Sequence, residues 1–196
     1  MMELERGLDL QLVLRENHNF QFTIFNQISM PKFSKKSTKQ KTIYQIDQSG
    51  KIEQTHRATA VAYSNTKIKT VYISSKEKQK LQSVFRLTGK NRIFVIQTFA
   101  ILVYLLLESD ITGQNKFVID KEYPGHEAII KSYIIQLFKN KKNQNIDPQK
   151  LHFSKIGKKS NAHKISNQAF NKKLKGRTVK AEEILALALL LEVKQK

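Results

Sequence analysis

Three short segments between residues 42 and 74 constrain the fold more than any other part of the sequence. They read TIYQID (42–47), ATAVAYS (58–64) and IKTVYIS (68–74), and all three are rich in β-branched and aromatic residues. QSG follows the first segment and NTK follows the second, and both are typical of turns. Because strands joined by tight turns pair as antiparallel neighbours, we predict a three-stranded antiparallel sheet.

Two more strands and several helices are predicted after residue 74. The strands are KFVID (116–120) and KLHFSKIG (150–157). Strands separated by helices return by crossovers, so we expect both to lie parallel to the first strand. The expected fold is therefore α/β, a mixed five-stranded sheet with three antiparallel strands, then two parallel ones, flanked by helices. The predicted helices cover 74–85, 92–108, 126–140, 160–174 and 178–193, with Ser74 or Ser75 as the first N-cap and Thr178 as the last.

Charge divides the chain into parts. Residues 1–29 carry a net charge of −2, and the remaining 167 residues carry +21. We predict a peripheral N-terminal extension at 1–29, a basic linker at 30–42 and one domain at 43–196. Met30 would be the natural start if the extension is an upstream addition. The alternating segments LDLQLVLRE and FQFTIFNQI leave a genuine hairpin open as the alternative.

The overall charge favours a polyanionic partner. Thirty-five Lys and Arg stand against 16 Asp and Glu, which gives a formal net charge of +19. Such a surface attracts nucleic acid, DNA or RNA, because lysines release the counterions of the phosphate backbone. Composition leaves a second explanation of the charge open. Of the basic residues, 29 are Lys, and the chain is also rich in Asn, Gln and Ile. This pattern is typical of AT-rich genomes.

No motif predicts a membrane or a disulfide-bonded protein. Cysteine is absent, which excludes disulfides and thiolate metal sites. The longest apolar run, IFVIQTFAILVYLLL (93–107), has 15 residues and is short for a membrane span, so a buried helix is the better interpretation. The N-terminus lacks the basic region and apolar run of a signal peptide. We expect no membrane partner and a cytoplasmic location.

Two aspartates occupy the ends of predicted strands. Asp47 stands in the first strand just before the QSG turn, and Asp120 ends the fourth strand before YPG. Each has an ordinary explanation, because Asp47 could accept hydrogen bonds from turn amides and Asp120 could cap the following helix. From Met30 onward the chain has only 12 acidic residues, so two at such positions are notable.

The order of predicted elements, together with IDQSG (46–50) and VIDKEYPG (118–125), resembles the ribonuclease H-like superfamily over residues 43–175. The IDxSG form is similar to the first-strand motif of a nuclease-like branch of that superfamily. The resemblance implies that the first and fourth strands are neighbours, so that Asp47 and Asp120 face each other. It also implies that the two carboxylates hold a divalent metal, Mg²⁺ or Mn²⁺, at a phosphodiester.

The resemblance further implies a third site residue near the helix after the fifth strand. His163 in KIGKKSNAH occupies that place, as a metal ligand or a group that positions water. A solvated histidine in a basic loop is the ordinary alternative. Amides and cations at this helix start would suit a phosphate, and the residues predicted to contact nucleic acid are Lys155, Lys158, Lys159, Ser160 and Lys164.

The sequence departs from the superfamily on the helix after the third strand, where members commonly have a glutamate. This helix carries Gln97 and has no acid before Glu108, which stands at the far end of a 17-residue helix about 25 Å long. Glu122 would share the face of Asp120 if the strand continued, so it is predicted as an additional metal ligand. Ordinary turn surface is the alternative for Glu122 and for two weaker candidates, His126 and Glu127.

Two functions fit these patterns. The first is a metal-dependent nuclease-like protein acting on nucleic acid phosphodiesters, with Asp47, Asp120 and His163 as catalytic residues. The second is a non-catalytic nucleic-acid-binding module with a degenerate metal site, which the missing helix glutamate favours. For an enzyme of another class there is no positive motif. The Leu-rich last helix is predicted to pack on the sheet, with a homodimer contact as the alternative.

Overall fold

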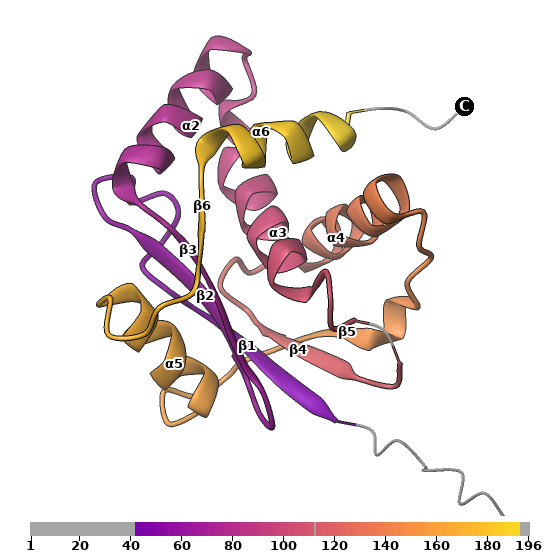
Figure 1. Cartoon of the computed structure of the whole chain (residues 1–196). Helices are drawn as coiled ribbons and strands as arrows, with labels where there is room; N and C mark the ends of the chain where they lie inside the picture. The colour runs from indigo at the N-terminus through magenta and orange to yellow at the C-terminus, as the bar shows by residue number, and fades with distance from the viewer. Residues whose placement is uncertain (1–41, 112, 193–196) are drawn as a thin grey trace, which may run out of the picture. The chain divides into compact units, whose positions relative to one another are not determined.

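A computed structural model describes residues 42–111 and 113–192 of the chain. The predicted extension at 1–29 and nearly all of the linker at 30–42 lie outside the described residues. Six strands form one sheet in the order β5-β4-β1-β2-β3-β6 (Figure 1). The strands are β1 (Ile43–Ser49), β2 (Thr59–Ser64), β3 (Ile68–Ile73), β4 (Lys116–Asp120), β5 (Leu151–Ser154) and β6 (Arg177–Val179).

The described residues also form five α-helices. They are α2 (Ser75–Leu87), α3 (Phe94–Leu107), α4 (Glu127–Lys142), α5 (Asn161–Phe170) and α6 (Ala181–Leu190), with short 3-10 helices η1 (Asn91–Ile93) and η2 (Pro148–Lys150). Ser74 caps α2 as predicted, because its side chain accepts a hydrogen bond from the Glu77 amide.

The pairing of the first five strands confirms the predicted mixed sheet. β2 is antiparallel to both β1 and β3, and β4 lies parallel to β1 with β5 parallel to β4. This strand order is that of the ribonuclease H-like fold. It makes β1 and β4 neighbours, with Ile46 opposite Ile119 in the register. The residues that follow in the two strands, Asp47 and Asp120, therefore lie side by side at one edge of the sheet.

The sixth strand corrects the prediction for the C-terminal region. Arg177–Val179 pairs in parallel with β3, and Thr178 lies opposite Tyr72. Thr178 is therefore part of a strand and is not the N-cap of the last helix. That helix begins at Ala181 after Lys180, whose side chain makes no cap hydrogen bond.

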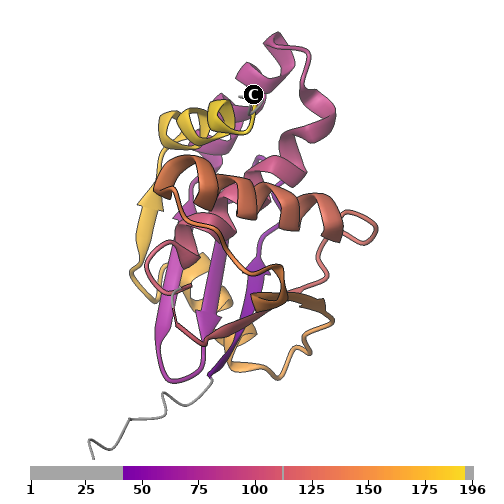
Figure 2. The same ribbon diagram turned by 90° about the vertical axis from the view of Figure 1, so that its right-hand side faces the viewer.

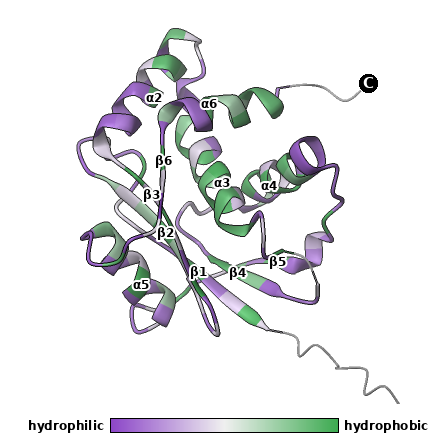
Figure 3. Ribbon diagram, in the orientation of Figure 1, coloured by the Kyte–Doolittle hydropathy of each residue, from purple (hydrophilic) through white to green (hydrophobic). Residues whose placement is uncertain are grey.

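The two faces of the sheet are covered unequally (Figures 1 and 2). α3 packs on β2 and β3 and in turn carries α4, whereas α5 contacts β1, β2 and β3 from the other face. α3 is apolar almost throughout and nearly all of its residues are buried (Figure 3). α6 packs against the helices α2, α3 and α4. The prediction that it packs on the sheet is therefore wrong. No helix in the described part of the chain is long and apolar enough to cross a membrane.

Alternation in β1 decides which side chains enter the core and which face α5. Ile46 is fully buried in the hydrophobic core with Val61, Val71 and Phe117. Asp47, the next residue, points to the other face, where its carboxylate meets side chains of α5. The sequence of β1 thus places one carboxylate under α5 while the neighbouring residues hold the strand in the core.

Gly50 directly follows β1 and has a conformation that other residues rarely adopt. Its φ is +74°, and a Cβ there would lie 2.3 Å from the Ala58 carbonyl oxygen and 2.5 Å from the ring of Phe170. Any side chain would therefore strain the turn and push α5 away from β1. Gln48 and Ser49, predicted as part of a turn, belong to β1, and residues 50–58 connect β1 to β2. Gly50 alone allows the close approach that lets α5 contact Asp47.

Candidate metal centre

Asp47 is a buried carboxylate held by two side chains of α5. Only 4% of the residue is exposed. Its Oδ2 accepts a hydrogen bond of 2.7 Å from the Ser166 hydroxyl, and the same oxygen lies 3.0 Å from Nδ1 of His163. Ser166 is itself fully buried and contacts the Ser49 hydroxyl at 2.9 Å. These contacts fix one oxygen of Asp47 toward the helix.

Asp120 ends β4 and ties the site to the segment after β5. Its Oδ1 accepts a hydrogen bond from the Ile156 amide. This partner lies between β5 and α5, so Asp120 does not act as the cap of α4 that its position before YPG allowed. The contact fixes the basic segment 155–160 beside the aspartate.

Glu122 joins the two aspartates through a tight turn. β4 stops at Asp120, so the strand does not continue as the sequence interpretation required. The Glu122 amide instead donates a 2.9 Å hydrogen bond to the Asp120 carbonyl, which turns the chain back. As a result, one carboxylate oxygen from each of Asp47, Asp120 and Glu122 lies within 4.8 Å of the others.

The electrostatics of this acid cluster disfavour three charged carboxylates. Burial raises the pKa of Asp47, and the charge of Asp120 adds to the rise, while Ser166 and His163 act in the opposite direction. Burial also raises the pKa of Glu122 to about 7, helped by the nearby charges of Asp120 and Asp47. Like charges brought together out of water are stabilised by a bound cation.

The donor atoms of the acid cluster fit a hard divalent cation. Carboxylate oxygens are the ligands that Mg²⁺ and Mn²⁺ prefer, and these ions are held by few carboxylates together with water or substrate oxygens. Asp47, Asp120 and Glu122 could therefore bind a metal.

Helix α3 contains no acidic residue, so the helix glutamate that the resemblance leads one to expect is absent. Gln97 of α3 is buried, and its Oε1 has no hydrogen-bond partner within the described residues. Glu108 forms an ion pair with Arg177 and takes no part in the acid cluster. Glu122 contributes the third carboxylate instead, from the loop between β4 and α4.

His163 and the predicted phosphate-contacting residues surround the start of α5. His163 is outside the acid cluster, and the contact with Asp47 uses its Nδ1, which leaves Nε2 as the other ring nitrogen. About a third of its side chain is exposed. Ser160 is the N-cap of α5, since its hydroxyl accepts from the His163 amide. The four lysines of this region are exposed: Lys155, Lys158, Lys159 and Lys164.

Two predicted candidates lie away from the acid cluster. His126 is the N-cap residue of α4 and its side chain makes no cap hydrogen bond. Glu127 faces Lys121 at 3.9 Å. For both residues the structure agrees with the ordinary turn-surface interpretation.

Sequence reasoning missed two residues that shape the site. Ser166 lies three positions after His163, a spacing that puts both on one face of α5, and this periodicity was the available signal. Tyr123 follows Glu122, and its hydroxyl accepts from Gln48 Nε2 at 3.2 Å and lies 3.3 Å from Glu53 Oε2. Its ring packs against Phe99 of α3. No sequence pattern marked Tyr123, because its partners Gln48 of β1, Glu53 and Phe99 of α3 are far away in the sequence.

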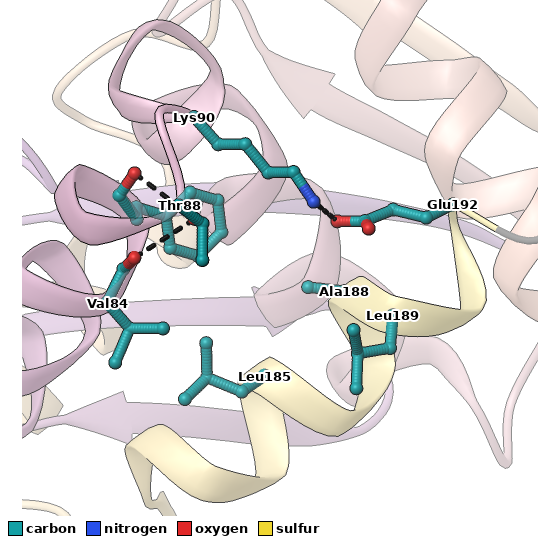
Figure 4. A pocket seen from close by; sticks show the side chains of 8 residues that line it. Val84, Thr88, Lys90, Leu185, Ala188, Leu189 and Glu192 are labelled. Atoms are coloured by element: carbon teal, nitrogen blue, oxygen red, sulfur yellow. Dashed lines mark hydrogen bonds and ion pairs between the residues drawn. The ribbon is translucent and has the colours of Figure 1, made fainter.

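An apolar pocket of about 250 Å³ lies between α2 and α6, on elements that do not contribute to the acid cluster (Figure 4). Val84, Leu185 and Leu189 line it, and an ion pair between Lys90 and Glu192 crosses one side. Lys90 and Glu192, the titratable residues of its lining, pair with each other, and none of the residues of the acid cluster lines the pocket.

Comparisons with known proteins add no further assignment. No family model, no curated protein and no solved structure matches the chain.

Proposed function

We propose that this protein is a metal-dependent nuclease-like protein that acts on nucleic acid phosphodiesters, with Mg²⁺ or Mn²⁺ held by Asp47, Asp120 and Glu122. The observation that carries the proposal is the approach of three carboxylates to within 4.8 Å at the end of β1 and β4. Bound there, the metal would supply Lewis-acid activation of a phosphodiester.

The chain's own groups have separate tasks in this proposal. Ser166 keeps Asp47 oriented by donating to the oxygen that faces α5. His163, oriented by Asp47 through Nδ1, presents Nε2 for exchange of a proton with water or with a leaving oxygen. The Ile156 amide donates a hydrogen bond to Asp120, which keeps the basic segment 155–160 next to the acid cluster. The lysines of this segment therefore hold the phosphate backbone beside the carboxylates.

A non-catalytic nucleic-acid-binding protein on the same fold is the second candidate. The observation in its favour is Gln97, an amide on α3 where a catalytic member of the superfamily would commonly have a glutamate. A protein of this kind would bind nucleic acid through the same lysines but would not cleave it.

A cleavage assay separates the two candidates. End-labelled single-stranded RNA, single-stranded DNA and an RNA–DNA hybrid are incubated with Mg²⁺, with Mn²⁺ or with EDTA. The nuclease proposal predicts cleavage that requires the metal and is lost in Asp120→Asn. Glu182→Gln is the matched control, because Glu182 is an exposed acid of α6 outside the acid cluster. Binding of the same substrates without any cleavage would favour the second candidate.

A further inference from the structure

A second hollow lies at the opposite end of α5 from the acid cluster. It has a volume of about 300 Å³, and its lining includes Tyr72 of β3, Ala169 of α5, Lys172 and Lys175. Gly176 also lines it, and a Cβ there would lie 1.7 Å from the Thr70 hydroxyl. The loop therefore sits on the strand so closely that only glycine fits.

Tyr72 differs from most aromatic residues in the described part of the chain. Its β3 neighbours Val71 and Ile73 are fully buried in the hydrophobic core, whereas Tyr72 is half-buried and lies outside that core. The alternation of the strand turns it to the face that carries α5. An aromatic ring left beside a hollow, with lysines around it, is the combination that proteins use to stack a base and hold its phosphates.

The side chains of the two lysines in the hollow are available to a ligand. No hydrogen bond or ion pair engages the side chains of Lys172 and Lys175 among residues 42–111 and 113–192. Lys172 also has a backbone φ of 59°, a left-handed conformation that is uncommon for a residue other than glycine or asparagine. Both side chains are exposed beside the hollow, where they add positive charge.

An acid-free stretch of sequence connects the hollow with the acid cluster. Residues 148–181 contain ten Lys and Arg and no Asp or Glu. High lysine usage alone does not explain why acids are missing from 34 consecutive residues. Within this stretch, α5 begins at the site, with His163 against Asp47, and ends at the hollow, with Ala169 in its lining. Ten helical residues span about 15 Å, which corresponds to roughly four phosphates of a stacked strand.

We propose that the hollow is a second nucleic-acid subsite, in which a single-stranded base stacks on Tyr72 while Lys172 and Lys175 hold the adjacent phosphates. This subsite rests on the proposed function, because it binds the same nucleic-acid strand whose phosphodiester lies at the acid cluster. That nucleic-acid strand follows the exposed side of α5 from the acid cluster to the hollow. The ligand class is single-stranded DNA or RNA, since a paired base could not reach a ring set in a hollow.

Fluorescence offers a direct test, because the chain contains no tryptophan. Tyr72→Trp places a single indole in the hollow, and Tyr133→Trp places one at a half-buried tyrosine of α4 as the control. Both proteins are titrated in EDTA with single-stranded oligonucleotides about three and about ten nucleotides long, chosen to be shorter and longer than the span of roughly four phosphates. We expect quenching of the Tyr72→Trp emission and little change for Tyr133→Trp. Equal responses from the two variants would overturn the subsite.

Affinity measurements test the same subsite without a probe. Tyr72→Leu should weaken binding of the longer oligonucleotide roughly tenfold, as removal of one base–aromatic stack does, and should affect the shorter one much less. Lys172→Gln with Lys175→Gln should flatten the salt dependence by about 0.7 for each phosphate that is no longer neutralised, measured against Lys139→Gln with Lys141→Gln. If these variants bound polyglutamate more weakly but bound the oligonucleotides as tightly as the wild type, the hollow would be a site for acidic polypeptides, which would contradict the proposal.

The outcomes distinguish this subsite from the proposed nuclease function. Quenching of Tyr72→Trp without any metal-dependent cleavage would retain the subsite and reject catalysis. Cleavage that is unchanged in Tyr72→Leu on long substrates, with no loss of affinity, would retain catalysis and reject the subsite. Thermal melts of each variant show whether it is folded, and the lysine pair, being exposed, keeps the test decisive if a Tyr72 variant does not fold.

Discussion

Nδ1 of His163 lies 3.0 Å from Oδ2 of Asp47, although 116 positions separate the two residues in the chain. The contact joins α5 to β1 at the point where β4 brings Asp120 alongside. It makes Asp47 part of two arrangements at once, the acid cluster and a pair with a partly exposed imidazole. Substitutions in and around the acid cluster can separate these two roles.

Replacing Asp47 by asparagine should remove metal-dependent cleavage and leave the fold intact. The substitution deletes a buried charge whose pKa is raised by burial and by Asp120, and Asn can still accept a hydrogen bond from Ser166. We expect activity to fall by at least about a hundredfold, while the free energy of unfolding changes by less than about 1 kcal/mol. A strongly destabilised variant with normal cleavage would show that Asp47 is a structural residue.

The pH dependence of stability should report Glu122. Its pKa is raised in the folded state from 4.5 to about 7, so its contribution to stability is fully present below pH 4.5 and is lost as the pH rises through 7. Without metal, the free energy of unfolding of the wild type, measured in urea, should fall by up to about 3 kcal/mol relative to that of Glu122→Gln as the pH rises across this window. Parallel curves for the two proteins would mean that Glu122 is not held in the acid cluster.

Removing the Ser166 hydroxyl should affect metal binding through Asp47. This hydroxyl lowers the pKa of Asp47, so Ser166→Ala should raise that pKa further and shift the pH of half-maximal metal binding upward. Loss of a buried hydrogen bond to a charged group should also cost about 1.5–3 kcal/mol. Ser132→Ala, on an exposed part of α4, is the control. An unchanged pH midpoint in Ser166→Ala would exclude a positioning role.

The sheet was predictable because its signals are local. Alternation marked the first three strands, and NTK marked the turn between β2 and β3. QSG was wrong as a turn, because Gln48 and Ser49 belong to β1. The helices between later strands required parallel crossovers. β6 was missed because it has only three residues, and Thr178 before acidic residues imitates a helix cap. The position of α6 was predicted wrongly because an apolar helix shows what it must bury but not whether the partner is a sheet or other helices.

The positions of site residues were predictable where strand order brings the residues together, and were not predictable where a local turn does so. Asp47 and Asp120 meet because β1 and β4 are neighbours, which follows from the fold resemblance. Glu122 joins them through a hydrogen bond between its amide and the Asp120 carbonyl, a local geometry that the residues EYPG do not specify uniquely. Ser166 and Tyr123 depend on contacts with elements far away in the sequence.

The lysines beside the acid cluster should contribute more to nucleic-acid affinity than lysines elsewhere. Lys158→Gln with Lys159→Gln should weaken binding across sequences and flatten the salt slope by about one unit for each phosphate that is no longer neutralised. The matched pair, Lys139→Gln with Lys141→Gln at the end of α4, should have a smaller effect. Equal reductions in affinity from both pairs at the same salt concentration would mean that affinity comes from diffuse charge.

Calorimetric titration of the wild type with Mg²⁺ and with Mn²⁺ tests the metal centre most directly. We predict saturable binding that raises the melting temperature. The free energy of unfolding should increase by about 2.7 kcal/mol when the ion is at about 100 times its Kd. Binding should be lost in Asp120→Asn and retained in Glu182→Gln, because only Asp120 belongs to the acid cluster. Wild-type protein that takes up neither ion, or an Asp120→Asn variant that binds as tightly as the wild type, would contradict the assignment.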